Sequence, residues 1–163
     1  VGERGEVCMK ADANMLGYLN KPEATAETIK DGWLHTGDVG YMDEEGYLYI
    51  VDRKKDMINR GGENIYPREI EIVLENHPKI AGVAVIGVPD RALGERVKAY
   101  VIPKPETVLT EDEVKEYLKD KIAKYKIPEF VEITNDIPRN QTGKIMKVEL
   151  RKLDAAKRAE TGN

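Results

Sequence analysis

A change of pattern near Asp52 is the feature that most constrains how this chain can fold. Residues 1–52 carry short alternating apolar and polar runs, broken by glycines and by an Asn-Lys-Pro turn. This pattern predicts small antiparallel strands, and so short a segment buries too little surface to be stable alone. After the charged connector 52–56, helical and strand signals are mixed. The sequence therefore predicts two parts, residues 1–52 and residues 53–163.

The second part opens with a helix signal followed by strand signals. Pro67 fits the first turn of a helix that ends near His77, because the missing proline N–H costs nothing there. The apolar runs 80–88 and 96–102 predict two neighbouring strands, and the prolines at 103–105 predict a turn.

Capping chemistry marks a second helix in this part. Thr110 opens a Thr-Glu-Asp-Glu capping box. The apolar residues that follow at helical spacing are Val114, Tyr117, Leu118 and Ile122. A strand at 130–134 and a terminal helix at 146–159 with a basic, solvated face complete the pattern. We expect an α+β fold in which a small sheet is packed by helices.

Composition excludes several classes of protein. The net charge of -4 lacks the basic excess of nucleic acid binding proteins. The lone Cys8 excludes an internal disulfide framework, and the longest apolar run is too short to span a bilayer. We therefore expect a cytoplasmic protein without a transmembrane segment. The first residue is Val1 rather than Met, and the opening segment has the pattern of a strand without a start signal. We therefore expect a fragment of a larger protein.

The two histidines predict neither a metal site nor a catalytic triad. His35 and His77 are too few and too far apart in the chain for a metal site, and no Ser or Cys arrangement accompanies them. His77 is expected to end a helix, where its positive charge would favour the C-terminal dipole.

Lys144 is the candidate catalytic residue. It stands on a loop, Pro138 to Lys144 (Pro-Arg-Asn-Gln-Thr-Gly-Lys), after an apolar run and before a helix. A phosphate-binding P-loop is excluded, because that motif needs a glycine where Pro138 stands and a Ser or Thr where Ile145 stands. The flexible stem of a lysine beside a glycine can carry a point charge into a neighbouring site. Taken alone, such a lysine more commonly lies solvated on a surface.

Two further segments carry candidate binding residues. The Thr36-Gly37-Asp38 run suits a ribose, because a carboxylate accepts hydrogen bonds from two vicinal hydroxyls, and Arg53 could hold the same sugar or a phosphate. Alone, Gly-Asp is a turn signal. The Gly61-Gly62 pair lets a ligand pass close to the backbone, and is equally typical of a hairpin turn.

The order and spacing of three motifs resemble those of the adenylate-forming superfamily. They are Gly32 to Asp38 (Gly-Trp-Leu-His-Thr-Gly-Asp), Tyr47 to Pro67 with its Asp-Arg-Lys-Lys-Asp and Gly-Gly-Glu-Asn-Ile-Tyr-Pro runs, and the Lys144 loop. This superfamily includes acyl-CoA synthetases, coumarate-CoA ligases, luciferases and peptide-synthetase adenylation domains. The resemblance is to the C-terminal third and covers nearly the whole chain.

The resemblance implies a role for each candidate residue. Lys144 matches the adenylation lysine, Asp38 the ribose-binding aspartate and Arg53 a second ribose contact, with Thr36 beside them. Lys55 matches the hinge on which a small C-terminal lid domain turns. In a second pose of the lid, the Gly61, Gly62 and Glu63 segment lines the pantetheine arm of coenzyme A. Residues 1–52 would then be the last barrel segment of a large N-terminal domain, and residues 53–163 the lid.

The implied reaction is ATP-dependent activation of a carboxylic acid, followed by thioester formation with coenzyme A. Mg²⁺ is implied only through ATP, and no metal ligand is expected in this chain. The chain alone is expected to be inactive and to need the N-terminal domain as its partner. Lys147 stands where the family commonly has Arg, and the Gly61 to Pro67 run looks closer to that of short- and medium-chain fatty acyl-CoA synthetases. Two alternatives stay open: an adenylation module that loads a carrier protein, and a noncatalytic nucleotide-binding domain.

Overall fold

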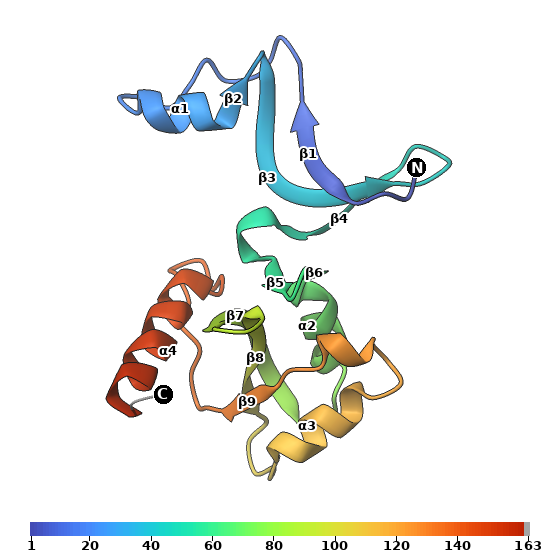
Figure 1. Cartoon of the computed structure of the whole chain (residues 1–163), viewed down its shortest axis with the longest axis vertical. Helices are drawn as coiled ribbons and strands as arrows, with labels where there is room; N and C mark the ends of the chain where they lie inside the picture. Colours follow the sequence, from blue (N-terminus) through green and yellow to red (C-terminus); the bar gives the residue numbers. More distant parts are fainter. Residues whose placement is uncertain (162–163) are drawn as a thin grey trace. The chain divides into compact units, whose positions relative to one another are not determined.

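The computed structural model describes residues 1–161, and these form two compact units (Figure 1). The chain divides between Lys55 and Asp56, inside the short 3-10 helix η1 (Lys54–Asp56). Both units mix helices with strands, which confirms the predicted α+β class. Every helix within the described range is too short or too polar to cross a membrane.

The first unit is built on one long curved strand, β3 (Trp33–Met42), to which the other strands pair antiparallel. The bend in β3 is visible in Figure 1, and the register shifts between Val39 and Gly40 where β4 pairs with it. Such an irregularity bends a strand. Gly40 is required there, because a Cβ would lie 2.7 Å from the carbonyl oxygen of Tyr49. The strands are β1 (Gly5–Met9), β2 (Ile29–Lys30), β3 (Trp33–Met42) and β4 (Leu48–Arg53).

The helix α1 (Pro22–Thr28) was not predicted, since this region was expected to hold strands only. Pro22 occupies its first turn, but none of its side chains is buried. A helix that buries no apolar stripe leaves no hydrophobic periodicity in the sequence, and so the pattern could not reveal it.

The second unit is organised around the hairpin of β7 (Ile80–Asp90) and β8 (Gly94–Pro103), which matches the two predicted strands. The strand β9 (Phe130–Ile133) pairs parallel with β8. The short hairpin of β5 (Ile58–Arg60) and β6 (Glu63–Ile65) joins the edge of β8 through Arg60 and Gly94. The five strands form one mixed sheet.

Both faces of this sheet are buried. Alternate residues of β7 and β8 enter a larger core with α2 (Pro67–Glu75) and α3 (Glu111–Leu118), or a smaller core with α4 (Lys147–Thr161), so helices cover the sheet on two sides (Figure 1). The larger core contains Val83, Val85, Val97, Ala99 and Val101 with Ile70, Leu74, Val114 and Leu118. The smaller core contains Ala84, Ile86, Val88, Tyr100, Ile137 and Leu150.

The helices begin close to where local chemistry predicts. Pro67 is the first residue of α2 (Pro67–Glu75), and Thr110 precedes α3 (Glu111–Leu118). The inclusion of Ile122 in that helix was wrong, because α3 ends at Leu118 and Asp120 adopts a positive φ of 62°. Ile122 still packs against the larger core.

The Thr110 cap is expected to stabilise the second unit. Its hydroxyl oxygen accepts a hydrogen bond from the Glu113 N–H at 3.2 Å. Thr110→Ala should lower the free energy of unfolding by about 1 kcal/mol, because that N–H loses its partner. Urea unfolding followed by circular dichroism measures the loss. Thr110→Ser keeps the hydroxyl and should retain most of the stability, so equal losses in the two variants would contradict the capping role.

Two expectations about charge in the second unit need correction. The basic face of α4 (Lys147–Thr161) is not simply solvated: Lys147 pairs with Glu71 at 2.7 Å and Arg151 with Asp56 at 2.9 Å. His77 is buried and its Nδ1 accepts the N–H of Lys79 at 3.1 Å. Burial lowers the pKa of His77, so it does not supply the predicted positive charge at the end of α2.

Candidate functional site

The Lys144 loop is a closed turn held at its base. The N–H of Met146 donates to the carbonyl oxygen of Pro138 at 2.8 Å, and the N–H of Asn140 donates to that of Lys144 at 2.9 Å. An isolated antiparallel bridge joins Arg139 to Ile145. These bonds fix both ends of the loop against each other just before α4 begins.

The Asn140 carboxamide braces the tip of the loop. Its Oδ1 accepts from the N–H of Lys144 at 2.8 Å, and from the N–H and hydroxyl of Thr142 at 3.1 and 2.8 Å. Gly143 adopts a φ of +81°, which a side chain would strain, and its carbonyl oxygen accepts from Arg139 at 2.8 Å. The Lys144 side chain is exposed and its ammonium has no hydrogen bond or ion pair within residues 1–161. The backbone is therefore ordered while the cation is available.

The predicted ribose residues lie together on β3 and β4. Asp38 and Arg53 are directly paired across the two strands, and Arg53 Nε lies 2.8 Å from Asp38 Oδ1. The Thr36 hydroxyl donates to the carbonyl oxygen of Val7 at 2.8 Å and accepts the N–H of Asp38 at 3.1 Å. Thr36 thus orders the backbone, and Arg53 orients the carboxylate. A carboxylate has about four acceptor positions, so Asp38 can still accept from a hydroxyl group.

The predicted coenzyme A segment forms the turn between β5 and β6. Gly61 and Gly62 both have positive φ, 60° and 92°, as a two-residue hairpin turn requires. The Gly61 N–H donates to the carbonyl oxygen of Leu93 at 2.7 Å, and Glu63 begins β6. A Cβ on Gly62 would meet no atom within 4 Å. The hairpin interpretation is confirmed, and the open backbone at Gly62 leaves room for a ligand to pass.

Lys55, the predicted hinge, is exposed and lies at the point where the two compact units divide. The predicted site residues are therefore distributed over both units. Asp38, Arg53 and Thr36 belong to the first, whereas the Gly61 turn and Lys144 belong to the second.

Sequence reasoning missed a cluster that surrounds Glu6. The antiparallel pairing of β1 with β3 sets Cys8 opposite His35, and the sequence did not reveal this contact because the two residues lie far apart in the chain. His35 Nδ1 lies 3.0 Å from Glu6 Oε2 and 3.4 Å from Cys8 Sγ, and Lys54 Nζ lies 2.8 Å from Glu6 Oε2. Three potential metal ligands are thus within 4.8 Å of one another. Since Lys54 already supplies a positive charge to Glu6, we interpret the cluster as an ion-pair network.

This network should make the first unit sensitive to acid. Hydrogen bonds from Lys54 and then His35 lower the pKa of Glu6 from 4.5 to about 2. A lowered pKa in the folded state adds stability above pH 4.5 that is lost as the pH falls towards about 2. Urea unfolding monitored by the fluorescence of Trp33, the single tryptophan, should show this loss. Glu6→Gln should be less stable at neutral pH and should lose less on acidification; equal pH dependence in both proteins would contradict the assignment.

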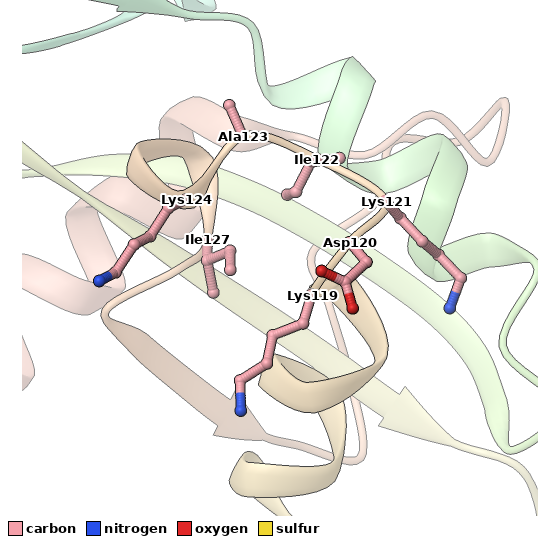
Figure 2. Close-up of a pocket in the computed structure, with 7 residues that line it drawn as sticks. All are labelled: Lys119, Asp120, Lys121, Ile122, Ala123, Lys124 and Ile127. Carbon is pink, nitrogen blue, oxygen red and sulfur yellow. The ribbon is translucent and has the colours of Figure 1, made fainter.

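A pocket lies beside the end of α3, and its lining differs from the predicted site segments described above. It is lined by Lys119, Asp120, Lys121, Ile122, Ala123, Lys124 and Ile127 (Figure 2). Figure 2 shows Lys121 extending to one side and Lys119 to another, so their ammonium groups do not converge on one point. Lys121 donates to the carbonyl oxygen of Tyr117 and Lys119 pairs with Glu116. None of the predicted site residues is among those lining this pocket.

Comparison with known proteins identifies the family. Residues 69–144, which end at the candidate lysine, match the model of the AMP-binding enzyme C-terminal domain. The chain belongs to the adenylate-forming superfamily. It is 49% identical over 152 residues to a Rhodococcus jostii CoA ligase for a ring-bearing propanoyl group, covering 93% of this chain and 30% of that protein. It is also 49% identical over 150 residues to an Escherichia coli long-chain-fatty-acid–CoA ligase, covering 92% and 27%.

Solved structures of this superfamily have the same fold. The crystal structure of ATP-bound MatB from Rhodopseudomonas palustris superposes with a TM-score of 0.86 at 38% identity, covering 93% of this chain and 30% of that one. The recognition of the superfamily from three short motifs is therefore confirmed. The chain spans about 30% of the length of the curated relatives it matches.

Proposed function

We propose that this chain works as the C-terminal part of an AMP-forming acid–thiol ligase, an acyl-CoA synthetase. The observation that carries the proposal is the exposed ammonium of Lys144 on a loop whose backbone is fixed by Asn140. A lysine on an ordered loop can deliver charge to a site built elsewhere without the further cost of ordering the backbone that carries it. The match of residues 69–144 to the AMP-binding C-terminal domain supports this interpretation.

In the first half-reaction, a carboxylate oxygen of the acid attacks the α-phosphorus of ATP, and the bond to pyrophosphate breaks. The products are acyl-AMP and pyrophosphate. The attack brings two anions together, so a cation at this point stabilises the transition state more than the separated substrates. Lys144 provides that cation. Asp38, oriented by Arg53, accepts hydrogen bonds from the ribose hydroxyls. Mg²⁺ would enter with ATP as part of the substrate, and no residue of this chain is assigned to it.

In the second half-reaction, the coenzyme A thiol releases its proton to solvent and its sulfur attacks the acyl carbon, while AMP leaves with the bonding electrons. Rotation at Lys55 moves Lys144 away from the reacting groups and brings the turn that contains Gly61 and Gly62 to them. The pantetheine arm then passes along the Gly62 backbone, where no neighbouring atom would contact even a Cβ. Residues 1–52 would belong to the large domain that binds the acid and ATP, and residues 53–163 to the mobile lid.

We propose an aliphatic carboxylic acid as the substrate class. The Gly61 to Pro67 run resembles that of fatty acyl-CoA synthetases, and one similar protein is named a long-chain-fatty-acid–CoA ligase. A panel of fatty acids and hydroxycinnamic acids, assayed for acid-dependent coenzyme A consumption, tests this. Preference for a hydroxycinnamic acid would overturn the aliphatic assignment and leave the reaction type intact.

The reaction is tested by product analysis with the full-length protein. Fatty acid, ATP and coenzyme A should yield AMP, pyrophosphate and acyl-CoA in equal amounts. Formation of ADP and phosphate, or no acid-dependent turnover, would contradict the proposal. Transfer to a carrier protein in preference to free coenzyme A would indicate a carrier-loading module. Tight AMP binding by the 163-residue chain alone would indicate a noncatalytic nucleotide-binding domain instead.

A further inference from the structure

The residue before the hinge is fastened to the first unit. Lys54 Nζ lies 2.8 Å from Glu6 Oε2, which ties the end of β4 to β1. The preceding residue, Arg53, is paired with Asp38 on β3. Because the pKa of Glu6 is lowered to about 2, its carboxylate stays charged at physiological pH. The chain is therefore held by two successive ion pairs up to Lys54.

The residue after the hinge is fastened to the second unit. Asp56 is only 9% exposed, and its Oδ1 lies 2.9 Å from a terminal nitrogen of Arg151 on α4. Arg151 follows Leu150, which is buried in the smaller core. One turn earlier, Lys147 pairs with the buried Glu71 at 2.7 Å. The first turns of α4, which directly follow the Lys144 loop, are thus attached to the hinge through Asp56, to α2 through Glu71 and to the sheet through Leu150.

Lys55 itself differs from both neighbours. Its side chain is exposed and forms no hydrogen bond or ion pair with any residue from 1 to 161. Rotation at Lys55 breaks none of the contacts above, whereas rotation at Lys54 or Asp56 would strain an ion pair. Removing one partner of the Asp56 pair would leave a nearly buried carboxylate without its counter-ion, which is costly.

We propose that the Glu6–Lys54 and Asp56–Arg151 ion pairs are positioning pairs that confine the lid rotation to Lys55, and that Asp56–Arg151 couples this rotation to Lys144. The inference rests on the proposed function. The Gly62 turn follows the hinge directly in the chain through Ile58, which is fully buried. Lys144 lies far along the sequence and reaches the hinge through α4. The two half-reactions should therefore depend differently on the pair between Asp56 and Arg151.

The kinetic test uses the full-length enzyme and separate assays of the two half-reactions. Arg151→Met should slow acyl-adenylate formation about tenfold, since small misplacements of a catalytic group are costly. It should leave thioester formation from preformed acyl adenylate nearly unchanged, and Arg151→Lys should restore most of the adenylation rate. Lys54→Met should slow both half-reactions, because the residue before the hinge loses its ion pair to Glu6 and the lid rotation is no longer confined to Lys55. The matched control, Lys79→Met, breaks an ion pair to Glu113 away from the hinge and should change neither.

A second measurement separates this inference from the proposed function. Hydrogen exchange of the amides in residues 54–58 should accelerate in Arg151→Met and in Lys54→Met, but not in Lys79→Met, at equal global stability. Hydrogen exchange does not depend on the reaction, so it tests the role of the ion pairs even if the full-length protein forms no acyl adenylate. In that case the proposed function fails, and the role of the ion pairs is still decided by the exchange rates. Unchanged exchange at 54–58, or parallel losses of both half-reactions in Arg151→Met, would overturn the inference.

Discussion

Replacing Lys144 with alanine in the full-length protein should slow acyl-adenylate formation by about two to three orders of magnitude, the scale for losing one preorganised donor. The fold should be unaffected, because the side chain is exposed and the loop is held by Asn140 and Arg139 through backbone groups. Acid-dependent exchange of labelled pyrophosphate into ATP measures this half-reaction directly.

Lys152 provides the matched control for this substitution. It is an exposed lysine on α4, and it forms a local ion pair with Glu149 at 2.9 Å. Lys152→Ala should leave pyrophosphate exchange unchanged. If both alanine variants lost activity to the same extent, a general effect of surface charge would replace the assigned role of Lys144.

A side chain at Gly62 should slow thioester formation by about two orders of magnitude, since displacement of a reacting group by about 1 Å has this effect. Gly62→Val combines a side chain with a φ of 92° that a β-branched residue adopts only under strain. It should therefore also destabilise the β5–β6 hairpin by about 1–3 kcal/mol. Transfer of the acyl group from preformed acyl adenylate to coenzyme A measures the first effect.

Gly62→Asn separates obstruction from strain. Asparagine tolerates positive φ better than other residues with a side chain, and the space around Gly62 is open. This variant should cost the hairpin less stability than Gly62→Val and still slow the transfer. Normal transfer in Gly62→Asn would remove Gly62 from the path of coenzyme A.

Elements with a local chemical signal were predicted closely. The cyclic side chain of Pro67 and the hydroxyl of Thr110 mark helix starts through interactions within one turn, so a short stretch of sequence contains the information. The apolar runs of β7 and β8 were visible because both faces of the sheet are buried. In contrast, α1 has no fully buried side chain, and the end of α3 depends on the backbone of Asp120.

The candidate site residues were proposed one by one from motifs, and the contacts around them were not predicted. The lysine, the Gly-Gly turn and the Asp-Arg pair each lie within recognisable motifs. The ion pairs on either side of the hinge do not lie within one motif: Asp56 meets Arg151, and Glu6 meets His35 and Lys54, only because distant strands and helices pack together. The buried state of His77 follows from the same packing, and for this reason its charge was predicted incorrectly.

The central claim is that one lid serves two half-reactions with two different surfaces. Both half-reactions should be measured in the full-length protein for Lys144→Ala and Gly62→Asn under identical conditions. We expect a crossed pattern, in which Lys144→Ala loses adenylation and retains thioester formation, while Gly62→Asn does the reverse. Equal losses of both half-reactions in both variants would contradict the claim.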